Sequence, residues 1–118
     1  MKILIEKEKK TPEVKYDKSK KELLIEGILI PENPEIFFDK FNQLVFSSYM
    51  LEKKLIINFY LEYFNTGAAR FMYKLLLKLK NKENIEIIWK YEVGDEDILE
   101  SGQEFEKLTG LPFIFEEV

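Results

Sequence analysis

The fold is decided by residues 55–80, which read LIINFYLEYFNTGAARFMYKLLLKLK and change their apolar spacing once. From Leu55 to Phe64 an apolar side chain stands at every odd position, as expected of a strand with one buried face. Beyond Asn65 the spacing is helical, and the predicted apolar stripe consists of Ala68, Ala69, Met72, Leu75, Leu76 and Leu79. The segment is therefore predicted to be a strand that continues directly into a helix.

The junction between this strand and this helix is Asn65-Thr66-Gly67. Asn65 is predicted to be the N-cap, because its side chain can accept hydrogen bonds from the unpaired N–H groups of the first helical turn. Thr66 then lies in the first turn and, on a helical projection, points away from the apolar stripe. The other residues of this outer face are Arg70, Tyr73, Lys74 and Leu77.

Two interpretations of the outer face are open. In the first, Arg70, the only arginine of the chain, binds a phosphate carried on the hydroxyl of Thr66 one turn earlier. The dipole of the helix favours the same anion by roughly 0.3–1 kcal/mol. In the second, Thr66 is an ordinary first-turn residue and Arg70 a solvated charge. Tyr73 and Leu77 on the same face favour a surface that a partner covers.

The composition predicts one globular domain over residues 1–118, with 46% hydrophobic and 14% aromatic residues. A net charge of −4 argues against a nucleic-acid-binding protein. The chain has no cysteine, which excludes disulfides and thiolate chemistry. It shows neither a signal peptide nor an apolar run near the ~18 residues of a membrane span, so a cytoplasmic protein without membrane contact is expected.

The other segments predict an α/β fold with a mixed β-sheet of about five strands, an N-terminal hairpin and the order β-β-α-β-α-β-α-β. The strands are expected at residues 13–17, 22–30, 55–64, 85–93 and 111–115, with a further candidate at 2–7, and the helices at 34–51, 66–80 and 95–109. Gly27 is expected at a bulge or bend. Clean alternation in 85–93 places the helices mainly on one face of the sheet, and two right-handed crossovers between parallel strands are expected in the second half of the chain.

Candidate catalytic groups are few, because the chain also lacks histidine. The only dense group is Asp95, Glu96, Asp97 and Glu100, which is typical of a solvated helix start and shows no metal-ligand spacing. We therefore expect a binding module that is not an enzyme and that needs no cofactor or metal. A small carboxylate-dependent enzyme centred on Asp95, Glu96 and Asp97 is the alternative.

The chain resembles the SiaC family of bacterial regulatory phosphoproteins, small domains similar in architecture to STAS-type anti-sigma-factor antagonists. The resemblance covers essentially the whole length. Its motifs in the first half are Thr11-Pro12, Val14, Asp17, Gly27, Pro31-Glu32-Asn33, Phe37-Phe38 and Tyr63-Phe64-Asn65-Thr66. In the second half they are Trp89-Lys90-Tyr91, Glu100, Glu104, Phe105 and Pro112-Phe113.

The resemblance implies a partner switch. In that family a serine/threonine kinase phosphorylates the threonine of the Asn-Thr motif, a PP2C-type phosphatase removes the phosphate, and the unphosphorylated form activates a GGDEF diguanylate cyclase. Carried over, Thr66 is the phosphorylated residue and Arg70 matches a basic residue four positions later. With the junction and the outer face of the helix, the predicted residues that bind phosphate or partners are Asn65, Gly67, Arg70, Tyr73, Lys74 and Leu77. The chain departs from the family at Gly67 and Ala68, where serines are common. A STAS-type antagonist that binds a serine/threonine kinase is the alternative.

Overall fold

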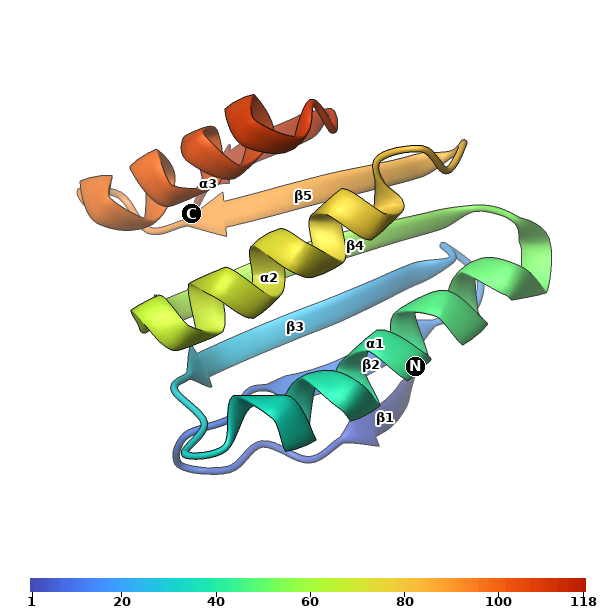
Figure 1. Cartoon of the computed structure of the whole chain (residues 1–118), viewed down its shortest axis with the longest axis horizontal. Coiled ribbons are helices and arrows are strands. Elements are labelled where there is room, and N and C mark those ends of the chain that lie inside the picture. The colour runs from blue at the N-terminus through green and yellow to red at the C-terminus, as the bar shows by residue number, and fades with distance from the viewer.

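The computed structural model describes residues 1–118 as a six-stranded sheet with three helices (Figure 1). The elements are β1 (Lys2–Ile5), β2 (Glu13–Asp17), β3 (Glu22–Leu29), α1 (Pro34–Glu52), β4 (Leu55–Phe64), α2 (Thr66–Leu79), β5 (Ile85–Tyr91), α3 (Glu96–Thr109) and β6 (Phe113–Glu117). The predicted α/β class is confirmed.

The strands lie in the sheet in the order in which they follow along the chain. β1, β2 and β3 are antiparallel, whereas β3, β4, β5 and β6 are parallel. One helix joins each parallel pair, and Figure 1 shows α1, α2 and α3 side by side over the same face of the sheet. The predicted layer of helices on one face is therefore confirmed.

The predicted N-terminal hairpin is confirmed as β2 and β3, but β1 adds to it, so the sheet has six strands rather than about five and begins with a three-stranded meander. β1 pairs with β2 through Lys2↔Tyr16 and Ile3↔Lys15. A four-residue strand followed by charged residues carries no sequence signal that identifies its partner. The two helical crossovers predicted in the second half of the chain are present, through α2 and α3, and because β3 is already parallel to β4 the fold contains a third, through α1.

The segment that decides the fold forms β4 and α2 with the predicted boundary. In β4, Leu55, Ile57 and Phe59 face the helices and are buried. The alternation breaks near the end of the strand, because Gly27 of β3 pairs with Leu61 and the next residue pairs with Tyr63, which leaves Glu62 as an extra residue. The predicted irregularity at Gly27 is thus confirmed, and it turns Tyr63 outward, where 57% of it is exposed.

α3 packs closely on β5 at one residue. Trp89 is buried, and its Nε1 donates a hydrogen bond to the carbonyl of Ile98 (2.8 Å). Gly102, one turn further along α3, lies over the indole ring so closely that a Cβ atom there would be 2.5 Å from Cδ1 and Nε1 of Trp89. The absence of a side chain at Gly102 therefore sets how close α3 comes to the sheet and to α2.

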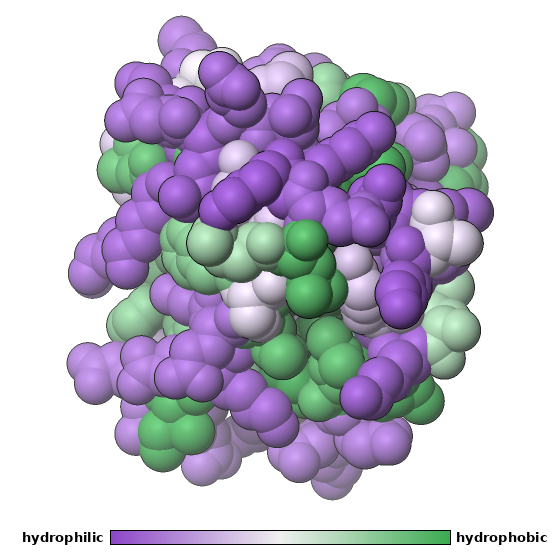
Figure 2. All heavy atoms as spheres, turned by 90° about the vertical axis from the view of Figure 1, so that its right-hand side faces the viewer, coloured by the Kyte–Doolittle hydropathy of each residue, from purple (hydrophilic) through white to green (hydrophobic).

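The two ends of the sheet differ in what they present. Hydrophilic residues cover most of the end at which β4 and β5 begin, with hydrophobic residues in patches between them (Figure 2). α1 finishes at this end with the exposed residues Met50 and Leu51. The junction between β4 and α2, which carries Thr66, lies at the opposite end (Figure 1). None of the three helices combines the length and the apolar character that crossing a membrane requires.

Candidate functional site

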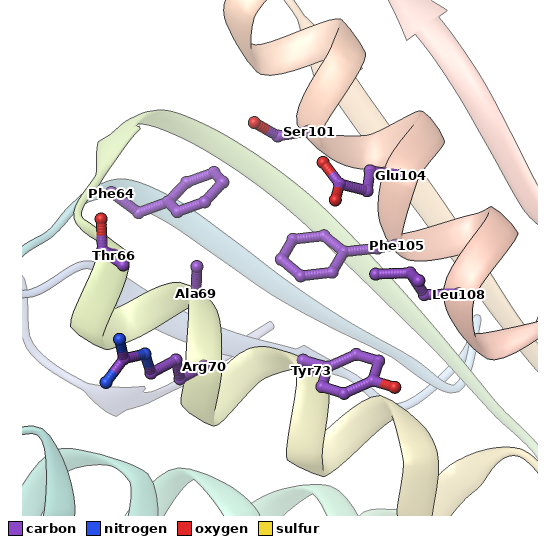
Figure 3. Close-up of a pocket in the computed structure, with 9 residues that line it drawn as sticks. All are labelled: Phe64, Thr66, Ala69, Arg70, Tyr73, Ser101, Glu104, Phe105 and Leu108. Atoms are coloured by element: carbon purple, nitrogen blue, oxygen red, sulfur yellow. The ribbon is translucent and has the colours of Figure 1, made fainter.

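A groove of about 240 Å³ lies between α2 and α3, and Thr66 is at its edge (Figure 3). Its lining combines the end of β4, one side of α2 and the facing side of α3. The lining residues are Phe64, Thr66, Ala69, Arg70, Tyr73, Ser101, Glu104, Phe105 and Leu108. The groove thus joins the predicted phosphorylation site to an apolar surface.

Thr66 is the first residue of α2 and its side chain is exposed. The preceding Asn65 acts as the predicted N-cap, because the amide of Ala68 donates to its Oδ1 (2.8 Å). The amide of Ala69 donates to the Asn65 carbonyl (2.9 Å), so the amides of Thr66 and Gly67 are the ones left free at this end of α2. A phosphate on Thr66 would therefore lie at the positive end of the helix dipole.

Arg70 and Glu104 give the groove one charge of each sign. Arg70 is exposed, lies one turn beyond Thr66 on α2, and takes part in none of the three ion pairs of the chain. Glu104 enters from α3 on the other side, and Figure 3 shows it between Ser101 and Phe105. The guanidinium is therefore free to pair with an added phosphate, while Glu104 would repel it.

Aromatic rings form the base of the groove. The ring of Phe64 lies 6.1 Å from that of Trp89 and 6.2 Å from that of Phe105, measured between centroids. The bulge in β4 allows this, because it brings Phe64 onto the helix-covered face together with Leu61. On α3, Leu108 adds an apolar side chain that is 51% exposed. An exposed apolar side chain beside aromatic rings favours contact with an apolar partner surface.

The structure brings together three of the seven predicted site residues, Thr66, Arg70 and Tyr73, in the lining of the groove. Asn65 contributes as the cap, and Gly67 packs near Pro34, whose Cγ would lie 3.9 Å from a Cβ at Gly67. The remaining two residues of the predicted outer face lie outside the lining.

Lys74 and Leu77 are these two residues. Nζ of Lys74 lies over the ring of Phe71, 5.4 Å from its centroid, and Phe71 stacks on Phe38 of α1. Lys74 is therefore directed toward α1, away from α3. Leu77 is exposed on α2, further along the helix than the groove.

Sequence reasoning missed the contribution of α3, namely Ser101, Glu104, Phe105 and Leu108. The spacing of residues within α2 cannot show which helix packs beside it. One signal was available, since Glu104 and Phe105 belong to the motifs that carry the family resemblance.

The acidic cluster at the start of α3 has a structural role. Asp95 is the N-cap of this helix, and its carboxylate accepts a hydrogen bond from the amide of Ile98 (3.1 Å). Glu96 and Asp97 lie in the first turn, where negative charge favours the helix. No group of three or more His, Cys, Asp or Glu side chains is arranged to hold a metal ion.

Comparison with solved structures identifies close matches in fold, all from Pseudomonas aeruginosa. A chain in the crystal structure of diguanylate cyclase SiaD in complex with its activator SiaC is 23% identical, with a TM-score of 0.85 over 97% of this chain and 98% of that chain. SiaC itself is 22% identical, with a TM-score of 0.83 over 100% of both chains. The crystal structure of apo-SiaC is 23% identical, with a TM-score of 0.78 over 98% of this chain and 99% of that chain.

These likenesses establish the fold, while the family follows from the sequence. No curated protein sequence matches the chain. The sequence model of the SiaC family of regulatory phosphoproteins, however, matches residues 5–118, which include every element of the fold except the first residues of β1. The chain therefore belongs to the SiaC family of regulatory phosphoproteins.

Proposed function

We propose that this protein is a partner switch controlled by phosphorylation of Thr66. A serine/threonine kinase adds the phosphate, a PP2C-type phosphatase removes it, and the unphosphorylated form binds and activates a GGDEF diguanylate cyclase. The observation that carries the proposal is the exposed hydroxyl of Thr66 beside a groove lined by Arg70, Tyr73, Phe105 and Leu108, in a member of a family of regulatory phosphoproteins.

The charge on the phosphate supplies the switch. Phosphorylation adds about −1.5 to −2 charges at the edge of an apolar groove. A partner that covers Tyr73 and Leu108 must then remove water from that charge, which costs several kcal/mol if the charge is unpaired. Arg70 offsets part of the charge within the free protein, and Glu104 repels it. The pairing with Arg70 favours a phosphorylated state that does not bind the partner, whereas the repulsion from Glu104 disfavours a phosphate placed inside the groove.

The residues at the start of α2 and on its outer face have different proposed roles. Thr66 accepts the phosphate, and the free amides of Thr66 and Gly67 favour it at the helix end that Asn65 caps. The partner contacts Arg70, Tyr73 and the exposed residues further along the helix, Lys74 and Leu77. The protein acts by binding in the cytoplasm and catalyses no reaction itself.

A diguanylate cyclase is the proposed partner because of the structural likeness. One similar chain comes from a complex of the diguanylate cyclase SiaD with its activator SiaC, and the alignment spans nearly all of both chains. A fold retained over the whole domain is consistent with a partner of the same kind.

The first experiment is to purify the protein from its host and determine its intact mass and the modified site. We expect a phosphate that maps to Thr66 and is absent from Thr66→Ala. Ser47→Ala, which removes an exposed hydroxyl from α1, is the matched control and should keep the phosphate. No phosphate under any growth condition, or a phosphate only at another residue, would contradict the proposal.

The second experiment measures the switch with a purified cyclase encoded in the same genome. Unphosphorylated protein should bind it and raise the rate of cyclic di-GMP synthesis, and the phosphorylated protein should do neither. Equal binding by both forms would refute the switch. Binding of the kinase with no binding of any cyclase would instead support the STAS-type antagonist.

A further inference from the structure

The face of the sheet opposite the helices is covered by no other part of the chain (Figure 1). The strand register arranges its outward side chains in three rows that cross the strands. The central row is Ile3, Lys15, Leu24, Asn58, Ile88 and Ile114. One flanking row is Asp17, Glu22, Ile56 and Glu86, and the other is Glu13, Glu26, Tyr60, Lys90 and Glu116. We call these three rows the open face.

The central row is mainly aliphatic. Ile3 and Ile114, on the outermost two strands, are each 45% exposed, and Leu24 and Ile88 are partly exposed between them. Lys15 and Asn58 are the polar members of the row, and Asn58 is nearly buried among its neighbours. An aliphatic strip, interrupted by Lys15 on β2 and Asn58 on β4, therefore crosses the sheet on the side that no helix protects.

Acidic side chains flank this strip on both sides. The open face carries six carboxylates, of which Glu22 is nearly buried, and two lysines, of which Lys15 forms an ion pair with Glu13 (3.0 Å). The whole chain has 22 acidic and 18 basic residues, so the rest of the molecule holds 16 of each sign. The entire net charge of −4 is thus concentrated on the open face.

Tyr60, in one of the flanking rows, responds to this charge. Burial raises the pKa of its hydroxyl, and the carboxylates of Glu92, Glu26 and Glu62 raise that pKa further. The hydroxyl donates a long hydrogen bond to Glu92 (3.4 Å). A phenol whose ionised form is disfavoured by three separate carboxylates lies in a region of negative potential.

We infer that the open face binds an amphipathic helix of another protein, one with an aliphatic stripe flanked on both sides by lysine or arginine. Neighbouring rows are about 7 Å apart, the rise of two residues along a strand. A helix about 10–12 Å in diameter that lies along the central row therefore places the residues beside its stripe above both acidic rows. Six strands spaced by about 4.8 Å span about 24 Å, which a helix of about 16 residues covers.

The negative charge of the open face disfavours the other possible binding partners. A second copy of the chain would place six carboxylates against six, so pairing between two open faces is disfavoured. Nucleic acids and anionic membranes are repelled for the same reason. A basic helix is attracted at a distance and then buries the aliphatic strip.

The test uses a synthetic peptide of about 16 residues with leucines on one helical stripe and lysines elsewhere, titrated into the ¹⁵N-labelled protein. A peptide of the same pattern with glutamate in place of lysine is the control. We expect the lysine peptide to shift amide signals of β2 to β6, including those of Leu24 and Ile88. Its affinity should fall about tenfold or more in ~0.5 M NaCl, where the Debye length is about 4 Å.

Two variants locate the binding surface. Ile88→Lys puts a charge in the aliphatic strip, and Glu26→Lys with Glu86→Lys reverses one charge in each acidic row. Each variant should bind the lysine peptide about tenfold more weakly than the wild type does. Leu51→Lys, at the exposed end of α1, is the matched control and should bind as the wild type does.

The stability of each variant is measured by urea unfolding. If Ile88→Lys fails to fold, the variant with Glu26→Lys and Glu86→Lys tests the inference by itself. Absence of binding, signals that shift only along α2 and α3, or equal affinity of all variants would overturn the inference. So would a dimer of the free protein whose interface is the open face. None of these measurements involves Thr66, so the inference can fail while the phosphorylation switch stands, and the reverse.

Discussion

Substitution of Gly102 by alanine should destabilise the protein, although alanine is the better helix former. The added Cβ would lie 2.5 Å from Cδ1 and Nε1 and 2.8 Å from Cε2 of Trp89. Ordinary carbon contacts are about 3.5–4.0 Å, so the helix or the indole must move by about 1 Å. Because Trp89 is buried among Phe59, Phe64 and Phe105, the indole has no free space to enter.

The magnitude follows from two opposing terms. Overpacking of a dense core costs about 1–3 kcal/mol, and the upper part of that range, about 2–3 kcal/mol, applies here because the indole has no free space to enter. Replacing glycine by alanine within a helix returns about 1 kcal/mol. The free energy of unfolding of Gly102→Ala should thus be lower by about 1–2 kcal/mol, which moves the urea midpoint by about 0.5–1 M for a typical slope. Gln103→Ala, at the next and exposed position of α3, should leave the midpoint nearly unchanged.

The single tryptophan reports the same event by fluorescence. If α3 moves outward, the hydrogen bond from Nε1 of Trp89 to the carbonyl of Ile98 lengthens and the emission of the folded state changes. The groove should widen as well, because α3 is one of its walls, and binding of a partner should weaken. A Gly102→Ala protein that is as stable as the wild type and has the same emission spectrum would refute the reasoning.

Three further substitutions test the site and its surroundings. Asn65→Ala should lower the free energy of unfolding by about 1 kcal/mol, because the amide of Ala68 loses its acceptor. Asn65→Asp should retain most of the stability that the cap provides, and urea unfolding measures both variants. In protein phosphorylated on Thr66, Arg70→Ala should raise the pKa of the phosphate in ³¹P NMR, because the guanidinium no longer favours the dianion. The hydrogen bond from the hydroxyl of Ser19 lowers the pKa of Asp17 below its ordinary value of 3.8. This carboxylate therefore stabilises the fold above that value, and the stabilisation is lost as the pH falls through the lower pKa of the folded state. Ser19→Ala should reduce the free energy of unfolding at pH 7, and that free energy should fall less steeply on acidification than in the wild type.

The sequence predicted the elements whose signals are local. The helical spacing after Asn65, the cap at its start and the alternation in β5 each depend on residues a few positions apart, and each is confirmed. The relations between distant segments were not predictable in the same way. Whether β1 pairs at all, and whether α3 lies against α2, depends on packing between residues far apart in the chain. The four residues of α3, among the nine that line the groove, were missed for this reason.

At the end of β4, one extra residue reverses the side-chain orientation that the sequence predicted. Unbroken alternation would place Tyr63 with Leu61 on the covered face, but the extra residue Glu62 places Phe64 there instead. Phe64→Ala should therefore cost about 2–3 kcal/mol in urea unfolding, less than the 3–5 kcal/mol of a fully buried ring, because Phe64 also lines the groove. Tyr63→Ala should cost about 0.5 kcal/mol or less, since the side chain is mainly in solvent. The opposite order of the two costs would mean that β4 keeps its alternation to the end, and that the ring beneath Thr66 is not the one described.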